Sequence, residues 1–456
     1  MADGAYDCIV IGAGPGGYVA AIRAAQLGMK TAVIERDRVG GRCLNYACIP
    51  AKAVLRAADI LTEVREADDF GVKVSGVELD YAGVMQRRDK VVTTLTSGVA
   101  GLFKKNGIES IEGDATLAGD GKVLAGSQEL TAKTIVLATG SVRRPIPGAE
   151  YGGRVIGTEE AWAMLELPES MAVVGAGASG AEIASAFARF GTDVFLFEAL
   201  DRVLPTEDAD ISKVVGRGLG RQGITVHTST FVSDIASTGS AVKFTHGEES
   251  REVEWLVIAA GRGADIDGLG LDAAGVKLDE SGLIDVDGAM RTSAAGVYAI
   301  GDLVHGPALA HKASDEGVIA VEDAAGLETH PLVYVDIPRA TFCQPNVGSF
   351  GLTEAQAVEQ GYDVVVGKVQ YGAVGGGTVY GDRTGVVKLV GERKYGELLG
   401  GHIAGTRATE LIQGLVNIRA LEGGIPEVAR TIHGHPTLSE AVMEAGRAAD
   451  GWLIHG

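Results

Sequence analysis

The chain has 456 residues, 46% of them hydrophobic, and 60 acidic against 40 basic residues give a formal net charge of -20 at pH 7. This length predicts about three domains, and the acidic charge argues against nonspecific binding to nucleic acid or to an anionic membrane surface. No stretch approaches the roughly 18 apolar residues of a membrane span, and the acidic start does not resemble a secretory signal, so we expect a cytoplasmic protein.

Residues 6–36 predict a strand, a glycine turn, an alanine-rich helix and a second strand, which is the order of a βαβ unit. The turn carries Gly12, Gly14 and Gly17 in the spacing G-x-G-x-x-G. In such a turn the first glycine permits the conformation, the second lets a pyrophosphate approach the backbone, and the third packs helix on strand. Glu35 ends the second strand, where a carboxylate can accept hydrogen bonds from ribose hydroxyls. We therefore predict a dinucleotide site.

Cys43 and Cys48 lie in the next segment, GGRCLNYACIPAK at 40–52. In a regular helix their Cα atoms would be farther apart than the roughly 7 Å that a disulfide can span, so a bond between them requires a distorted turn. Strain of that kind would raise the reduction potential, as suits a working disulfide. A zinc site would need two further ligands, and Cys8 and Cys343 stand alone, so we expect no metal. A redox pair is preferred, and two structural thiols are the alternative.

Helices are expected at 52–66 and 85–105. The sequence TIVLATGS at 134–141 predicts a buried strand that ends in a glycine turn at Gly140. The segment 143–148 contains two prolines and predicts a connector, which we take as the first domain boundary.

Residues 170–198 repeat the βαβ plan, with Gly175, Gly177 and Gly180 in the turn and Glu198 at the end of the second strand. Two dinucleotides are therefore implied. An acid at this position would repel a 2′-phosphate, so NAD is favoured over NADP. Arg202 lies nearby in the sequence and leaves that preference a moderate one.

Later segments complete these units and add a third part. Strands are expected at 255–261, ending at Gly261, and at 296–302, ending at Asp302, and a helix follows within 308–326. From about residue 336 the chain predicts an α+β region that carries no nucleotide motif, with strands at 385–390 and 398–405 and helices at 407–421 and 437–449. Subunit contact or substrate handling are its candidate roles.

The cysteine segment at 40–52 is similar to the disulfide motif of the flavoprotein disulfide reductases, the class I pyridine nucleotide-disulfide oxidoreductases. Within this family the dihydrolipoamide dehydrogenases are most similar, through residues 12–28, 198–210, 296–302, 309–317 and 433–441. The resemblance implies an α/β fold with two Rossmann-like domains, for FAD and NAD, and a C-terminal α+β dimerisation domain. The domains implied are 1–148 for FAD, 149–268 for NAD, 269–335 to complete the FAD domain, and 336–456 for the dimer interface.

The resemblance also implies roles for single residues. Cys48 would lie nearer the flavin, and Cys43 would be the thiol that meets the substrate. Lys52 would lie by the flavin ring and pair with Glu182. His435 would be the base, oriented by Glu440, and would act on the active site of the partner subunit, with His433 as the competing histidine. Cofactor contacts are implied at the two glycine turns and their acids, and at Gly140, Gly261, Asp302 and Ala310, where Ala310 belongs to a helix N-terminus that points at the flavin.

The activity implied is oxidation of dihydrolipoamide by NAD+ through the Cys43–Cys48 disulfide and FAD in a homodimer. One alternative is a reductase of another small disulfide, glutathione-like or mycothiol-like. Another is a mainly structural subunit of a 2-oxoacid dehydrogenase or glycine-cleavage assembly. The chain departs from the family pattern at Arg42, at Tyr46-Ala47 and in the expected turn at 262–264. These departures could alter substrate choice and dinucleotide geometry.

Overall fold

The computed structural model describes residues 5–456, and the chain divides into two compact units. Unit 1 combines the described part of Met1–Ala53 with Gly83–Arg144 and Gly261–Tyr334. Unit 2 combines Val54–Ala82, Pro145–Ala260 and Val335–Gly456. Each unit therefore contains one of the two predicted glycine turns and joins segments that are far apart in the sequence. The predicted division into four domain segments stays a prediction.

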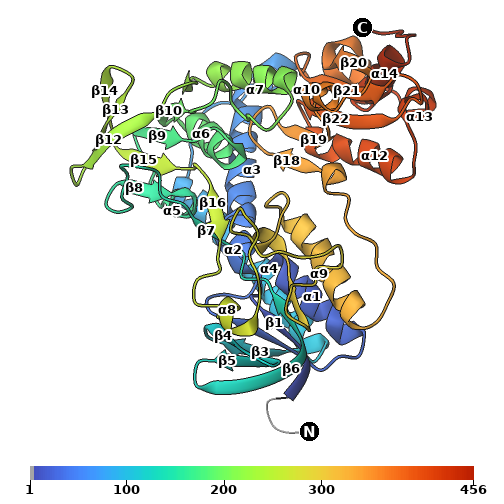
Figure 1. Ribbon diagram of the computed structural model, residues 1–456. Helices are drawn as coiled ribbons and strands as arrows, with labels where there is room; N and C mark the ends of the chain where they lie inside the picture. The colour runs from blue at the N-terminus through green and yellow to red at the C-terminus, as the bar shows by residue number, and fades with distance from the viewer. Residues whose placement is uncertain (1–4) are drawn as a thin grey trace. The chain divides into compact units, whose positions relative to one another are not determined.

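Unit 1 is built on a seven-stranded sheet in the order β3-β2-β1-β6-β5-β4, with β17 pairing to β6 (Figure 1). Strands β1, β2, β3 and β17 run parallel to their neighbours, whereas β4, β5 and β6 form an antiparallel meander. Successive residues of β1 enter two different cores, so both faces of the sheet are buried. The strands are β1 (Ala5–Ile11), β2 (Thr31–Glu35), β3 (Glu109–Glu112), β4 (Ala115–Gly119), β5 (Lys122–Ala125), β6 (Gln128–Leu137) and β17 (Val297–Ala299).

Helices α1 (Pro15–Gln26) and α9 (Ala310–Ala324) pack closely against each other beside this sheet. A Cβ added at Gly16 would lie 2.9 Å from the carbonyl oxygen of Ala313, and one at Gly317 would lie 2.7 Å from that of Gly16. Larger side chains at either position would push the helices apart. The remaining elements of unit 1 are α2 (Gly41–Asn45), β7 (Ser141–Arg143), β16 (Arg262–Ala264), α8 (Leu271–Ala274) and the short helix η2 (Gly301–Leu303), while α3 (Cys48–Arg65) and α4 (Tyr81–Lys105) continue into unit 2.

The first half of unit 2 contains a parallel sheet in the order β11-β10-β9-β15-β8 and a three-stranded antiparallel sheet in the order β12-β13-β14. Its strands are β8 (Val155–Gly157), β9 (Ser170–Val174), β10 (Asp193–Phe197), β11 (Thr225–His227), β12 (Val232–Ser237), β13 (Val242–His246), β14 (Glu249–Val253) and β15 (Trp255–Ile258). Its helices are α5 (Thr158–Ala163), α6 (Ala178–Phe190) and α7 (Ala209–Arg221), and the short helix Ala67–Phe70 also belongs to this unit.

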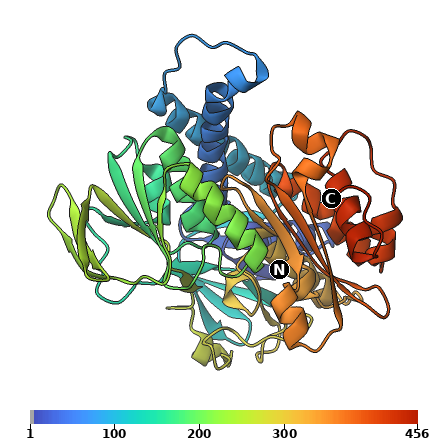
Figure 2. The ribbon, with the colours of Figure 1, turned by 90° about the horizontal axis from the view of Figure 1, so that it is seen from above.

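The second half of unit 2 is an antiparallel sheet in the order β18-β19-β22-β21-β20 with helices around it. Figures 1 and 2 show α7 between this sheet and the parallel sheet, and α7 contacts β22 while α6 contacts β18. The elements are β18 (Arg339–Thr341), β19 (Val347–Gly351), α10 (Glu354–Glu359), β20 (Val364–Gln370), α11 (Gly375–Val379), β21 (Val386–Glu392), β22 (Leu398–Ala404), α12 (Ala408–Ala420), α13 (Ile425–Arg430) and α14 (Glu440–Ala449). The predicted α/β class with two nucleotide-type halves and an α+β tail is confirmed.

The turn expected at 262–264 is wrong. These residues form strand β16, which pairs antiparallel with β7. Arg262 fixes the pairing, because its Nε donates to the Ser141 hydroxyl at 2.9 Å. Gly263 leaves room for a neighbouring side chain, since a Cβ there would lie 2.7 Å from the Arg144 Nε. The departure from the family pattern thus lies in a two-stranded ribbon.

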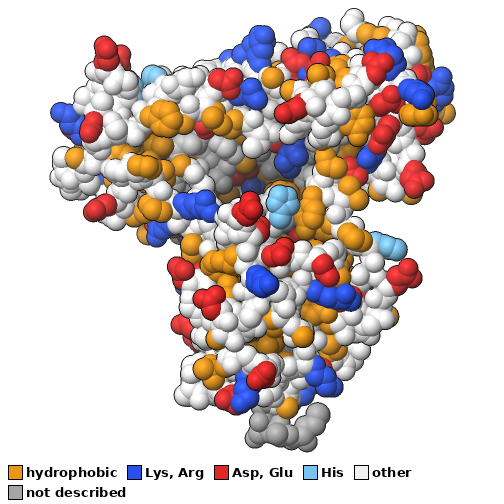
Figure 3. Space-filling view, in the orientation of Figure 1, with side chains coloured by type: hydrophobic (Ala, Val, Ile, Leu, Met, Phe, Trp, Pro, Cys, Tyr) orange, Lys and Arg blue, Asp and Glu red, His pale blue; other side chains and the backbone are white. Residues whose placement is uncertain are grey.

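The surface carries both signs of charge. Figure 3 shows acidic and basic side chains interspersed over one face, so on that face the net charge of -20 is not gathered in one patch. Among residues 5–456, no helix combines the length and the apolar content that crossing a bilayer requires.

Candidate active site

The first glycine turn has the geometry that a dinucleotide phosphate requires. Gly12 has φ +103°, and a Cβ there would lie 2.4 Å from the carbonyl oxygen of Ala138. A Cβ at Gly17 would lie 1.9 Å from the Gly12 carbonyl oxygen, whereas one at Gly14 would meet no described atom within 4 Å. Helix α1 begins directly after this open position, with no side-chain cap on its N-terminus. Open space beside a helix N-terminus fits a pyrophosphate.

Glu35 is held beside this turn by the backbone. Its Oε2 accepts a hydrogen bond from the Ala13 N–H at 2.7 Å, and its Oε1 accepts one from the Asp37 N–H at 2.9 Å. Each carboxylate oxygen has a second lone pair, which a ribose hydroxyl can use. The acid therefore lies at the turn, as its spacing predicts, and it also fixes the turn.

The second glycine turn repeats this arrangement. Gly175 has φ +102°, and a Cβ there would lie 2.7 Å from the Ala259 carbonyl oxygen. A Cβ at Gly180 would lie 1.8 Å from the Gly175 carbonyl oxygen, and one at Gly177 would again meet no described atom within 4 Å. Glu198 accepts from the Ala176 N–H at 2.7 Å and from the Leu200 N–H at 2.9 Å. This turn fits a second dinucleotide with an acid at the ribose.

Arg202, the residue that could relax the preference for NAD, is engaged with its own loop. Its Nη1 lies 3.5 Å from the Asp201 carboxylate, and its Nη2 donates to the Pro205 carbonyl oxygen at 3.4 Å. The Glu198 carboxylate is buried and lies directly at the turn. A negative charge at this position favours ribose hydroxyls over a 2′-phosphate.

The two cysteines lie on either side of a break in the helix. Cys43 is in α2, Cys48 begins α3, and Tyr46 between them has φ -132° and ψ -19°, outside the helical range. This is the distorted turn that the spacing requires. Both cysteines are half-buried free thiols. A gap in the helix lets the two sulfurs approach each other.

The surroundings of Cys43 disfavour its thiolate. A hydrogen bond with Cys48, burial, and the charge that a Cys48 thiolate carries together raise the pKa of Cys43 well above its usual range, although Lys52 and Arg42 act in the opposite direction. A base is needed to remove the Cys43 proton near neutral pH.

Tyr46, one of the departures from the family pattern, ties the cysteine segment to the first nucleotide turn. Its hydroxyl donates to Asp37 Oδ2 at 2.7 Å, and the Asp37 N–H in turn donates to Glu35. The segment also touches the turn directly, because a Cβ at Gly41 would lie 2.6 Å from the Gly14 Cα. The redox segment and the predicted FAD ribose acid are thus parts of one hydrogen-bonded structure.

Replacing Tyr46 by phenylalanine removes this tie and leaves the ring in place. We expect FAD to dissociate about fivefold faster, since a lost hydrogen bond of this kind is worth about 1 kcal/mol. Flavin fluorescence after dilution into mild denaturant measures the rate. Tyr395→Phe is the matched control, because that ring is 78% exposed and far along the chain. Equal rates in both variants would show that the tie does not hold the flavin.

Of the other cofactor positions implied by the family, Gly140 and Asp302 follow strands β6 and β17 of the unit 1 sheet, and Gly261 directly precedes β16. Asp302 in η2 accepts from the Ser141 hydroxyl at 2.5 Å. Gly140 and Gly261 have φ +81° and +119°, and a Cβ at either position would meet no described atom within 4 Å. Helix α9 begins at Ala310 with no side-chain cap. Ligands of open parallel sheets bind at such strand ends, so Gly140 and Asp302 fit a flavin in unit 1.

Sequence reasoning missed a buried ion pair that positions this region. Lys312 and Glu316 lie 3.1 Å apart with side chains fully buried. The Lys312 ammonium donates to the Gly301 carbonyl oxygen at 2.6 Å, and Glu316 accepts from the Gly301 N–H at 2.7 Å and from the Tyr334 hydroxyl at 2.6 Å. Both groups therefore hold Gly301, which directly precedes Asp302. The i, i+4 spacing of a lysine and a glutamate in a predicted helix was the available signal.

His435 and Glu440 are brought together, as the resemblance implies. The His435 Nδ1 lies 3.0 Å from Glu440 Oε1, and Glu440 Oε2 accepts from the Thr437 N–H at 2.9 Å. Burial alone would raise the pKa of Glu440, but these two partners outweigh it and lower the pKa, so the carboxylate stays ionised at neutral pH. The His435 side chain is 75% exposed, which leaves Nε2 accessible to a substrate.

The competing histidine is His433, and the two residues of the predicted Lys52–Glu182 pair belong to different units. His433 is half-buried, and burial lowers its pKa. Glu182 is buried on α6 and accepts from the Phe342 N–H at 2.9 Å. Lys52 lies on α3, one helical turn after Cys48, and belongs to unit 1. The Lys52–Glu182 pair stays a prediction.

Comparison with known proteins covers nearly the whole chain. A family model described as pyridine nucleotide-disulphide oxidoreductase matches residues 6–317, and its dimerisation-domain model matches 337–446. Dihydrolipoyl dehydrogenases of Bacillus subtilis and Mycobacterium tuberculosis are 41% and 43% identical, each over 99% of both chains. The crystal structure of LpdA from Mycobacterium tuberculosis has a TM-score of 0.90 at 26% identity, covering 97% of this chain and 99% of that one. The HOCl-induced flavoprotein disulfide reductase RclA from Escherichia coli, solved as a Cu(II) complex, has a TM-score of 0.87 at 26% identity and covers 97% of this chain and 98% of its own.

Proposed function

Because this chain belongs to the pyridine nucleotide-disulphide oxidoreductase family, we propose that it oxidises dihydrolipoamide with NAD+, with Cys43 and Cys48 as the redox pair. It is an FAD- and NAD-dependent oxidoreductase, and its C-terminal dimerisation domain supports a homodimer. The observation that carries the proposal is the helix break between the cysteines, which lies against a glycine turn that fits FAD. Structural thiols alone would need neither the break nor this neighbour.

The proposed chemistry is thiol–disulfide exchange at the cysteine pair. One substrate thiolate attacks the Cys43 sulfur of the Cys43–Cys48 disulfide, which forms a mixed disulfide and releases Cys48 as a thiolate. The second substrate thiolate then attacks the substrate sulfur of the mixed disulfide, which closes lipoamide and releases Cys43. His435 accepts the protons that the substrate thiols lose and returns one to Cys43, whose pKa is raised. FAD, when bound, carries the two electrons from the reduced pair to NAD+.

The second candidate is a reductase of another small disulfide, glutathione-like or mycothiol-like. Arg42 and Tyr46 flank the cysteines and differ from the family pattern, and these side chains are where a different substrate would be selected. We also propose that the chain is a subunit of a 2-oxoacid dehydrogenase or glycine-cleavage assembly. Co-purification with such an assembly without lipoamide turnover would favour the mainly structural role.

The deciding experiment reduces the purified protein anaerobically with NADH or NADPH and then adds a panel of disulfides. We expect reduction by NADH rather than NADPH, a long-wavelength absorbance from a Cys48 thiolate beside the flavin, and turnover with lipoamide. Faster turnover of glutathione disulfide or mycothiol disulfide than of lipoamide would show that this other disulfide is the substrate. Flavin reduction without the long-wavelength absorbance would contradict the role of Cys43 and Cys48 as the redox pair.

A further inference from the structure

One row of polar side chains crosses the C-terminal sheet of unit 2. Arg339 on β18 is opposite Ser349 on β19, which is opposite His402 on β22. His402 is opposite Lys388 on β21, and Lys388 is opposite Lys368 on β20. Residues that lie opposite each other in neighbouring strands point to the same face of a sheet. We call these five residues the polar row.

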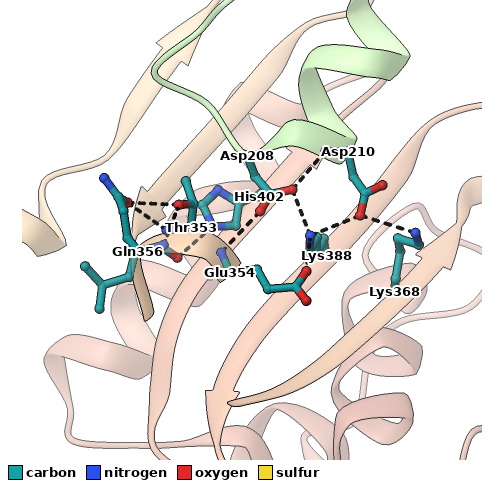
Figure 4. Close-up of polar contacts among 9 residues, drawn as sticks. Asp208, Asp210, Thr353, Glu354, Gln356, Lys368, Lys388 and His402 are labelled. Atoms are coloured by element: carbon teal, nitrogen blue, oxygen red, sulfur yellow. Dashed lines mark hydrogen bonds and ion pairs between the residues drawn. The ribbon is translucent and has the colours of Figure 1, made fainter. Parts of the chain in front are cut away.

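Acidic side chains from the start of α7 lie on the polar row (Figure 4). Lys388 Nζ lies 2.9 Å from Asp208 Oδ1 and 3.0 Å from Asp210 Oδ2, and Lys368 Nζ lies 3.2 Å from the same Asp210 oxygen. Arg339 pairs with Glu207 at 3.2 Å. The segment 207–210 is thus held by cations from three strands of this sheet, Arg339 on β18, Lys388 on β21 and Lys368 on β20.

The central contacts are buried. Lys388 is 3% exposed, Asp208 is 2% exposed, and the third partner of Lys388, Glu354 Oε2, lies at 2.7 Å. Burial alone would lower the pKa of Lys388, but its hydrogen bonds to Asp208, Glu354 and Asp210 outweigh burial and raise it. For Asp208, burial would raise the pKa, and the Lys388 hydrogen bond helps to lower it. Both groups are therefore charged at neutral pH, and losing one leaves the other buried without its main partner.

Leu204, just before the segment held by the polar row, forms a wall of the second glycine turn. The Leu204 N–H donates to the Ala176 carbonyl oxygen at 2.8 Å, and Ala176 is the residue between Gly175 and Gly177. Leu204 is itself held from the 207–212 side, since its carbonyl oxygen accepts from the Glu207 N–H at 2.9 Å and from the Ser212 hydroxyl at 3.1 Å. The other side of Ala176, its N–H, is held by Glu198. Two independent supports therefore set this turn.

We propose that Lys388, at the centre of the polar row, is a positioning residue for NAD binding, acting through segment 204–210 on the Ala176 carbonyl. The inference rests on the proposed function in taking the second glycine turn as the NAD site. It joins a sheet of the dimerisation region to the nucleotide turn, over about 210 residues of sequence. Loss of the row leaves the acid Glu198 in place and releases only the opposite wall of the turn.

The test compares Lys388→Met with wild-type holoenzyme and with Lys394→Met, an exposed lysine in the β21–β22 turn. We expect the Kd for NAD+, measured by equilibrium titration, to rise roughly tenfold in Lys388→Met and to stay unchanged in Lys394→Met. Reduction of the holoenzyme by dihydrolipoamide without NAD+ should keep its rate within about twofold. A merely structural role would lower flavin content and that rate together, which would overturn the proposal.

Two further variants keep the outcome decisive. Asp208→Asn weakens the same ion pair and keeps a good N-cap for α7, so it replaces Lys388→Met if that variant does not fold, and an unchanged Kd there also overturns the proposal. Gly177→Val fills the open space of the turn itself. If Gly177→Val leaves NAD+ binding unchanged, the second turn is not the NAD site and the proposed function fails first. If it abolishes binding while Lys388→Met has no effect, only the positioning role fails.

Discussion

Replacing Cys48 by serine is expected to abolish lipoamide turnover while the protein keeps its FAD. The serine hydroxyl cannot form the Cys43–Cys48 disulfide, so the substrate thiolate has no disulfide to attack. We expect kcat to fall by more than about a thousandfold, as for loss of a covalent catalytic group. FAD should be retained, because the glycine turn, Glu35 and Asp302 are untouched. Lipoamide reduction by NADH and the flavin absorbance of the purified variant measure the two outcomes.

The controls separate redox chemistry from packing. Cys343 is buried and its thiol donates to the Pro345 carbonyl oxygen at 3.2 Å, so a serine there can keep the bond. Cys343→Ser should therefore keep lipoamide turnover. In Cys48→Ser, NADH should still bleach the flavin, because that step does not pass through the cysteines. Full lipoamide turnover in Cys48→Ser would sink the assignment of the redox pair.

Local features of the site could be predicted from the sequence because they depend on backbone sterics. Gly12 and Gly175 have φ +103° and +102°, a backbone conformation that favours glycine. Each turn is therefore visible in the sequence as a short glycine motif. The break between Cys43 and Cys48 follows from the reach of a disulfide and also needs no distant residue. The positions of Glu35 and Glu198 could also be predicted, because each acid lies one helix and one strand after its glycine turn.

Contacts across strands could not be predicted in the same way. The five residues of the polar row have no regular spacing in the sequence. Only the register of five strands brings them into one row. The same holds for Tyr46 and Asp37, which meet because a loop folds back over the nucleotide turn. The strand at 262–264 was hidden for a related reason, since β16 exists only through its pairing with β7.

His435→Gln is expected to lower kcat/KM for dihydrolipoamide by about a hundred- to ten-thousandfold, the usual worth of a positioned general base. Glutamine can keep a hydrogen bond to Glu440 but cannot accept the substrate proton. His433→Gln is the matched control, two residues earlier on the same loop, and should change kcat/KM far less. Equal losses in both variants would leave the base unassigned.

The His435 side chain is exposed and can therefore reach a second subunit. We expect its Nε2 to serve the cysteine pair of the partner subunit, which requires a site built from both chains. A mixed dimer of one His435→Gln chain and one Cys43→Ser chain would then contain one site with an intact histidine and intact cysteines, and one site with neither. Such a dimer, isolated with two different affinity tags, should regain about half of the wild-type activity. If the histidine instead served its own chain, each site of the mixed dimer would lack one group, and the activity would stay at the level of the two parent variants.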